Sequence, residues 1–203
     1  MDALIENVIS RLTLESQKEM MKEVDIASED RMLAITQDTG EFFNIILKAI
    51  NAKNILEVGM STGYSTLWFS DAVKNNSGHI TTIEKNLNKV LRAKKNFQGA
   101  KVENLVDIKH GIALEVLKEI SLGNQKFDFV FLDADKENTM QYFEMVLKMT
   151  RIGGIIAIDN MIYPEKYRSE MSEISQKIKQ IPNVQSSTIK IGNGEEIILK
   201  ISD

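Results

Sequence analysis

Apolar residues in the first fifty positions recur at intervals of three and four, which places them on one face of a helix. The sequence therefore predicts helices within residues 1–52, ahead of a different pattern that starts at residue 54. The apolar positions that define these helices are Leu4, Ile5, Val8, Ile9 and Leu12, followed by Phe42, Phe43, Ile46, Leu47 and Ile50.

From residue 54 onward, short apolar runs alternate with amphipathic stretches. Strands separated by helices are typical of βαβ units, which form a parallel sheet covered by helices on both faces through right-handed crossovers. Three of the runs are nearly unbroken in apolar residues, as expected of central strands that are buried on both faces. The predicted strands occupy residues 55–59, 79–84, 102–108, 127–133 and 153–159, and the central ones are 55–58, 129–132 and 155–158.

The C-terminal segment has a different pattern. Residues 184–191 and 195–202 are two strand-like runs separated by Gly192-Asn193-Gly194, which predicts an antiparallel hairpin. The predicted fold is therefore α/β, with a Rossmann-like sheet of seven strands that is mostly parallel, ends in an antiparallel hairpin and carries helices on both faces. Because no repeat or linker interrupts the chain, we expect one domain over residues 1–203, with its core in residues 53–203.

Composition narrows the function classes. The chain has 203 residues, 43% hydrophobic and 27% charged, which is typical of one globular domain and excludes disorder. The formal net charge of −4 does not favour polyanions, and the absence of cysteine excludes disulfides and thiolate metal sites. The N-terminus does not resemble a signal peptide, and no stretch approaches the ~18 apolar residues of a membrane span. We therefore expect a cytoplasmic protein without a membrane partner.

Ligands of open α/β sheets bind outside the carboxyl ends of the strands, so polar residues there are the candidates for chemistry. The first strand ends in a glycine turn, from Gly59 to Gly63, and the second strand ends at Glu84. A glycine turn lets a ligand approach the main chain, and an acid at the second strand can bind two ribose hydroxyls. A purely structural turn and a solvated glutamate are the alternatives. The dinucleotide motif G-x-G-x-x-G is missing, so the pair favours a nucleoside without pyrophosphate, such as S-adenosylmethionine.

Two further strands end in oxygen-donating side chains. Asp133 follows the fourth strand, and Asp159 and Asn160 follow the fifth. If these strands are neighbours, two carboxylates and an amide oxygen meet and form a site for a hard cation, which suits Mg²⁺ better than zinc. The alternative is that Asp133 and Asp159 cap the helices that follow.

Lys136 lies three residues after Asp133. A divalent cation and burial both disfavour the charged form of a lysine, which makes a general base feasible. The same cation would acidify a hydroxyl bound to it. The alternative is a surface lysine paired with Asp135 or Glu137.

These motifs resemble those of the cation-dependent O-methyltransferases, which include catechol O-methyltransferase and the caffeoyl-coenzyme A O-methyltransferases. ILEVGMSTGYS, TTIEKN, FDFVFLDADK and GGIIAIDN occur in the family's order and spacing, and the resemblance covers roughly residues 35 to 202. It implies transfer of a methyl group from S-adenosylmethionine to a hydroxyl of a catechol-like small molecule, with Mg²⁺ or, alternatively, Mn²⁺ or Ca²⁺. It also implies a homodimer.

The resemblance further implies a role for each matching residue, with the N-terminal helices of residues 1–52 capping the cofactor site. The cofactor would be held by Ile35, Thr36, Glu57, Gly59, Ser65, Glu84, Ala113 and Asp133, with Glu84 at the ribose and Ala113 nearest the adenine. The metal would be held by Asp133, Asp159 and Asn160. The catalytic residues would be Lys136, as the general base, and Asp133.

The sequence departs from the family in two places. The segment after Asn160 enters a helix soon, so the loop that many relatives place over the acceptor is short, and the family's Asp-Gly before an apolar residue is here Asn193-Gly194-Glu195. Both departures concern the acceptor rather than the cofactor.

Three other functions stay open from the sequence. One is a tRNA 5-hydroxyuridine O-methyltransferase, because residues 85–101 hold six basic side chains and no acid, although the acidic net charge favours a small molecule over nucleic acid. The second is a non-catalytic S-adenosylmethionine-binding protein, and the third is a nicotinamide dehydrogenase.

Overall fold

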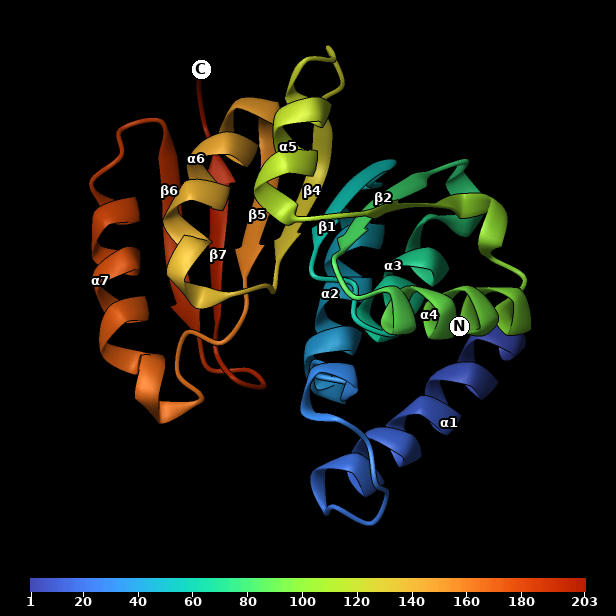
Figure 1. The fold of residues 1–203 in the computed structure, drawn as a ribbon. Coiled ribbons are helices and arrows are strands. Elements are labelled where there is room, and N and C mark those ends of the chain that lie inside the picture. Colours follow the sequence, from blue (N-terminus) through green and yellow to red (C-terminus); the bar gives the residue numbers. More distant parts are fainter.

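A single mixed sheet organises the chain, whose computed structural model describes residues 1–203 (Figure 1). The seven strands lie in the order β3-β2-β1-β4-β5-β7-β6, and only β7 runs antiparallel to its neighbours. The strands are β1 (Asn54–Val58), β2 (His79–Glu84), β3 (Val106–His110), β4 (Phe127–Leu132), β5 (Thr150–Ile158), β6 (Val184–Ile189) and β7 (Glu195–Lys200).

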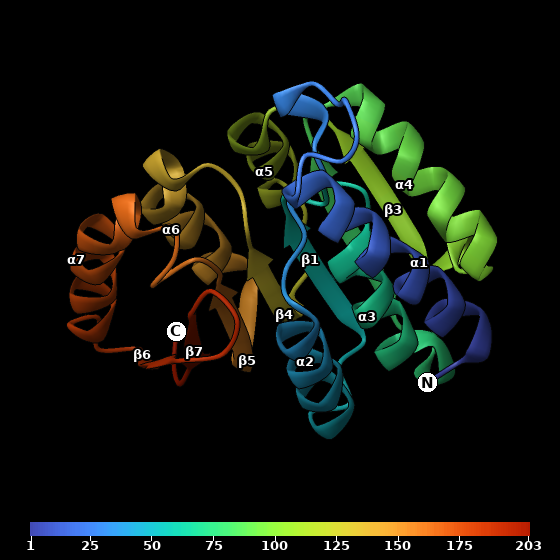
Figure 2. The ribbon, with the colours of Figure 1, turned by 90° about the horizontal axis from the view of Figure 1, so that it is seen from below.

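Seven α-helices cover the two faces of the sheet, as Figures 1 and 2 show from perpendicular directions. Helices α1 to α4 contribute to one apolar cluster and helices α5 to α7 to the other, so the sheet is buried on both sides. The helices are α1 (Ala3–Met20), α2 (Gln37–Ala49), α3 (Tyr64–Val73), α4 (Leu87–Ala100), α5 (Ala113–Ser121), α6 (Thr139–Met149) and α7 (Arg168–Lys179).

This architecture confirms the predicted fold class. Strands β1, β4 and β5, whose sequences are the most continuously apolar, are neighbours in the middle of the sheet. The C-terminal hairpin β6–β7 is antiparallel, as predicted from the Gly-Asn-Gly turn. None of the helices combines the length and the apolar composition that crossing a bilayer requires.

The predicted start of the third strand was wrong. The strand begins at Val106 rather than at residue 102, because the chain is still leaving α4 at that point. Lys101 adopts a left-handed conformation, and the Val102 N–H donates to the Phe97 carbonyl, which closes the helix end. Residues Glu103–Leu105 then form one turn of 3₁₀-helix before the strand.

The topology fixes where a ligand can bind. The chain runs from β1 outward to β2 and β3 and then returns to β4 on the other side of β1, so the connections diverge between β1 and β4. At such a point the loops after the two strands separate and leave room beyond the carboxyl ends. Among the predicted site residues, Gly59 follows β1, Asp133 and Lys136 follow β4, and Asp159 and Asn160 follow β5.

Candidate active site

The glycine turn after β1 packs directly on the loop after β4. Gly59 has φ of 102°, and a Cβ atom at this position would lie 2.0 Å from the Asp133 carbonyl oxygen. The Gly59 and Met60 N–H groups both donate to the Ile83 carbonyl at 3.0 Å. A residue without a side chain is therefore required here, and it brings the turn and Asp133 together.

Glu84 binds the same turn from β2. Its Oε2 accepts from the Ser61 N–H at 2.8 Å, and its Oε1 accepts from the Asn86 N–H at 2.8 Å. The side chain is partly exposed and is held by the main chain rather than free in solvent. The Ser61 hydroxyl is buried and has no partner, so the turn still offers a polar group to a ligand.

Glu57 lies beneath this turn and is fully buried. Its carboxyl accepts hydrogen bonds from Ser65 at 2.5 Å, Thr66 at 2.6 Å and Thr82 at 2.5 Å. Burial outweighs these three donors and raises the pKa of Glu57 to about 7. Glu57 therefore holds the first turn of α3, including Ser65, from below.

The remaining predicted cofactor residues lie on other elements. Ile35 is buried, and Thr36 precedes α2, where its hydroxyl donates to the Thr39 hydroxyl at 3.0 Å. Ala113 is the first residue of α5, and the turn before it is fixed to β2 by the Gly111 N–H, which donates to the Glu84 carbonyl at 3.0 Å.

Asp133 and Lys136 form an ion pair beside the glycine turn. The Asp133 N–H donates to the Val58 carbonyl at 2.9 Å, and Lys136 Nζ lies 3.3 Å from Asp133 Oδ1. The Lys136 side chain is only 9% exposed, and it pairs with neither Asp135 nor Glu137. Its amine is therefore directed inward, toward the carboxyl ends of β1 and β4.

Asp159 and Asn160 follow on the neighbouring strand. The Asp159 N–H donates to the Leu132 carbonyl at 3.1 Å, and the residue is 2% exposed. Asn160 has a left-handed backbone, and its N–H donates to Asp159 Oδ1 at 2.5 Å. Neither Asp133 nor Asp159 caps a helix, since α6 and α7 have Asn138 and Tyr167 in the capping positions.

Sequence reasoning did not assign a role to Glu195, which the structure places next to Asp159. The antiparallel register pairs Ile158 with Glu196, so the residues that follow and precede them are adjacent. Glu195 is fully buried, and the register brings it beside Asp159. Burial and the neighbouring acids raise the pKa of both Asp159 and Glu195, so the pair retains a proton near neutral pH.

These side chains supply oxygen donors and no soft ligand, which is the chemistry of a hard-cation site. As they stand, no three His, Cys, Asp or Glu side chains are gathered closely enough to hold a metal ion. The predicted set of Asp133, Asp159 and Asn160 contains two such side chains and one amide.

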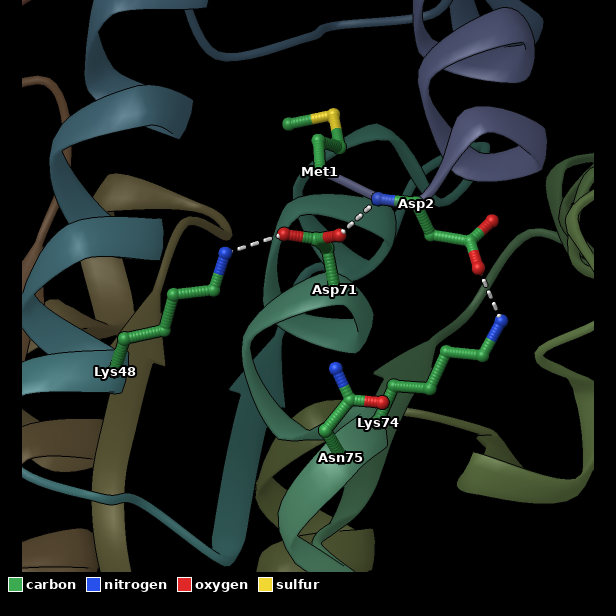
Figure 3. A pocket seen from close by; sticks show the side chains of 6 residues that line it. All are labelled: Met1, Asp2, Lys48, Asp71, Lys74 and Asn75. Carbon is green, nitrogen blue, oxygen red and sulfur yellow. Dashed lines mark hydrogen bonds and ion pairs between the residues drawn. The ribbon is translucent and has the colours of Figure 1, made fainter.

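A pocket of about 290 Å³ lies away from the candidate site residues, at the C-terminal ends of α2 and α3 (Figure 3). Its charged groups are already paired, because Lys48 Nζ lies 2.7 Å from Asp71 and Lys74 Nζ lies 2.6 Å from Asp2. Although burial opposes it, the Lys48 ammonium lowers the pKa of Asp71. The pocket is therefore a structural ion-pair network and not a candidate for the reaction. It is lined by Met1, Asp2, Lys48, Asp71, Lys74 and Asn75.

Comparison with known proteins shows the family of the chain. A family model described as O-methyltransferase matches residues 10–201. The chain belongs to this O-methyltransferase family. It is an S-adenosylmethionine-dependent enzyme of the caffeoyl-CoA O-methyltransferase type, which excludes the nicotinamide dehydrogenase considered above.

Individual relatives of this O-methyltransferase match it over most of their own length. The chain is 31% identical to the caffeoyl-CoA O-methyltransferase of Mesembryanthemum crystallinum, over 99% of this chain and 87% of that protein. It is 29% identical to caffeoyl-CoA O-methyltransferase 1 of Eucalyptus globulus, over 99% and 89%. The O-methyltransferase from Bacillus cereus in complex with SAH superimposes with a TM-score of 0.81 at 25% identity, over 98% of this chain and 91% of that one.

Proposed function

We propose that this O-methyltransferase transfers the methyl group of S-adenosylmethionine to one hydroxyl of a catechol-like small molecule, with a divalent cation held by Asp133, Asp159 and Asn160. The supporting observation is the position of Lys136. Its buried amine lies 3.3 Å from a carboxylate of the candidate metal set and next to the glycine turn. A base, oxygen ligands and a cofactor turn are thus within one site.

The proposed cofactor site uses the main chain of the turn more than its side chains. Gly59 lets a ligand approach closely, and the first N–H groups of α3 have no partner within the helix. Glu84 is placed for the ribose, and Ala113 for the adenine. Ile35 and Thr36 would close the site from the N-terminal side, while Glu57 acts through Ser65. Bound S-adenosylmethionine would supply an electrophilic methyl group on a positively charged sulfur.

The proposed metal site fits a hard cation because all its donors are oxygen atoms. Mg²⁺ is the proposed ion, and Mn²⁺ or Ca²⁺ are the alternatives. A divalent cation there would supply Lewis acidity, which lowers the pKa of a hydroxyl bound to it. The main chain of Asp133 and of Asp159 is fixed by hydrogen bonds to the neighbouring strands, so both side chains extend from a rigid backbone.

Lys136 is the proposed general base, and it would take the hydroxyl proton on Nζ. Its inward orientation and 9% exposure shield the amine from bulk water. Asp133 would orient this amine through the ion pair. The protein then contributes mainly by holding the acceptor oxygen in line with the methyl group.

The proposed acceptor is a small molecule rather than tRNA. Four of the six basic residues on and around α4 are exposed, namely Lys85, Lys94, Lys95 and Lys101, which favours a basic surface. However, Lys89 is buried, and Arg92 is bound to Glu19 at 2.7 Å. Together with a net charge of −4, this leaves the small-molecule reaction as the better supported one. By resemblance alone, we further propose that the enzyme is a homodimer.

The deciding experiment measures methyl transfer to a panel of vicinal diols, with and without EDTA. We expect activity that EDTA abolishes and Mg²⁺ restores. Lys136→Met should lower kcat by about 10²–10⁴-fold while S-adenosylmethionine binding, followed by calorimetry, stays within about threefold. Activity that is insensitive to EDTA contradicts the metal assignment. Transfer to tRNA only, with an affinity that falls steeply as salt rises, supports the alternative acceptor.

A further inference from the structure

The turn between β6 and β7 is hydrogen-bonded to two segments that are far apart in sequence. Residues 190–194 form this turn, and the Gly194 N–H closes it by donating to the Ile191 carbonyl at 2.8 Å. Figures 1 and 2 show the turn, in red, reaching from the hairpin toward the start of α2. The proposed function gives the turn no role, although both segments that it binds adjoin proposed site residues.

On one side, the turn holds the segment that directly follows Asn160. Three consecutive N–H groups, those of residues 161–163, donate to the Asn193 and Gly194 carbonyls at 2.9 to 3.0 Å. A Cβ atom on Gly194 would lie 2.5 Å from the Ile162 side chain, so the two chains are in close contact. The turn therefore fixes the main chain next to the proposed metal residues.

On the other side, the turn meets the first turn of α2. The Gly192 N–H donates to Asp38 Oδ2 at 3.3 Å, and the same carboxylate accepts from the Thr39 N–H at 3.0 Å and from the Thr36 hydroxyl. Gly192 has φ of 52°, and a Cβ atom there would clash with the hydroxyl groups of Thr36 and Thr39. The Thr39 hydroxyl also makes a long hydrogen bond, of 3.4 Å, to Glu195 at the start of β7. Asp38 thus ties the turn to the segment around Thr36.

We propose that Asp38 is a positioning residue for methyl transfer, which holds residues 161–163, through the β6–β7 turn, in a fixed place relative to the start of α2. This inference rests on the proposed function, which places the cofactor near Thr36 and the cation beside Asn160. Transfer in line requires that the acceptor oxygen and the methyl group be aligned, and a small misplacement slows it strongly. Because the turn is bonded to both sides, it can maintain that alignment from outside the reacting groups.

The first measurement is amide hydrogen exchange in the full chain, without cofactor or metal. Asp38→Ala removes the acceptor of the Gly192 N–H, so we expect exchange at residues 161–163 to become about fivefold faster. These amides bond to the turn and not to α2, so a role of Asp38 confined to α2 would leave them unchanged. Glu41→Ala is the matched control, because Glu41 is an exposed acid on α2 that accepts from Gln37 and not from the turn. It should leave exchange at residues 161–163 unchanged.

Gly192→Ala breaks the same contact from the side of the turn. Its Cβ displaces the turn from Thr36 and Thr39, while the Asp38 carboxylate keeps its bonds within α2. We expect Gly192→Ala to speed exchange at residues 161–163 as Asp38→Ala does. The double variant should exceed neither single variant by more than about twofold, since both changes act on one contact. Additive effects of the two changes would overturn the route through the turn.

The second measurement is methyl transfer in the presence of Mg²⁺ to a vicinal diol that the unmodified protein accepts. Asp38→Ala should lower kcat about tenfold, while the Kd of S-adenosylmethionine and the KM of the diol change by less than about threefold, because alignment is lost and not binding. Unchanged exchange at residues 161–163 overturns the proposal, and so does faster exchange with an unchanged kcat. If the unmodified protein methylates no diol, the proposed function fails, whereas the exchange measurement still decides whether Asp38 holds this segment.

Discussion

Glu57 is an acid enclosed entirely by protein, and three hydroxyl groups from β2 and α3 donate to it. Burial nevertheless dominates, because hydroxyl dipoles replace bulk water only in part, and the pKa rises from 4.5 to about 7. The folded chain therefore holds a proton that the unfolded chain has lost. The residue supports the glycine turn and links the stability of that turn to pH.

We expect the stability of the protein to depend on pH through Glu57. Between pH 4.5 and about 7 the folded state binds more protons at Glu57 than the unfolded state, so stability falls as pH rises through this range. The shift corresponds to a loss of the order of 3 kcal/mol. Glu57→Gln cannot titrate, so its unfolding free energy relative to the unmodified protein should improve as pH rises from 5 to 8, as measured by urea unfolding.

Glu144→Gln is the control for this prediction, because Glu144 is an exposed glutamate on α6. Its unfolding free energy should differ from that of the unmodified protein by the same small amount at both pH values. An equal pH dependence in Glu57→Gln and in the unmodified protein would show that Glu57 is not the titrating group.

Some residues of the candidate site could be proposed from the sequence alone, and others could not. Asp133, Asp159 and Asn160 could be proposed because each directly follows a strong apolar run, and a parallel sheet brings the ends of such runs to one edge. The inward orientation of Lys136 could not be foreseen, because it depends on how the loop after β4 packs. The sequence did not reveal that Glu195 lies beside Asp159. This proximity depends on the pairing of β5 with β7, which joins residues far apart in sequence.

At the scale of elements, the contact between the turn after β1 and the loop after β4 determines the geometry of the site. The two strands pair in register from Ile55 with Phe129 to Val58 with Leu132, so their loops leave the sheet together. Gly59 then lies against the Asp133 carbonyl. The proposed cofactor turn and the proposed metal loop both depend on this single contact.

Gly59→Ala should disrupt the contact between the turn after β1 and the loop after β4. A Cβ atom would lie 2.0 Å from the Asp133 carbonyl oxygen, and φ of 102° is itself unfavourable for alanine. The loops must separate, so we expect a loss of about 3 kcal/mol or more in thermal unfolding. Gly99→Ala is the control, because Gly99 is exposed and its Cβ would meet only Val8 of α1, at an ordinary contact distance of 3.5 Å. The control should be neutral or up to about 1 kcal/mol more stable, and equal effects of the two changes contradict the prediction.

The boundaries of elements were harder to predict than their number and order. Central strands are marked by apolar residues on both faces, and the run in β4 was found to within one residue. The edge strand β3 is only partly buried, so its pattern is weak, and the apolar Val102 before it belongs to the end of α4. A residue that closes a helix and one that opens a strand cannot be distinguished by hydrophobicity alone.

At the scale of the whole molecule, the end of α1 and the segment that follows it are attached to α4, while α1 and α2 also bind α3 through the Asp2–Lys74 and Lys48–Asp71 ion pairs. Glu19, at the end of α1, is 4% exposed and binds Arg92 at 2.7 Å. The same guanidinium donates to the Asp30 carbonyl at 2.8 Å, and the Asp30 carboxylate accepts from Asn86 at 2.8 Å. These bonds hold residues 21–35, the segment that leads to Thr36 and the proposed cofactor site.

The last prediction tests this attachment with Arg92→Met, which keeps much of the side-chain volume but removes the charge. Glu19 would then be a buried acid without its ion pair, so we expect a loss of about 1–3 kcal/mol in unfolding free energy. Because the segment is released from α4, trypsin should also cut faster at Lys22 and Arg31 in the folded protein. Lys95→Met, on the same helix but exposed and unpaired, should change neither quantity. Unchanged cleavage in Arg92→Met would mean that the apolar contacts of α1 hold the segment without the ion pair, and a similar effect of both variants would instead indicate a general role of the positive charge on α4.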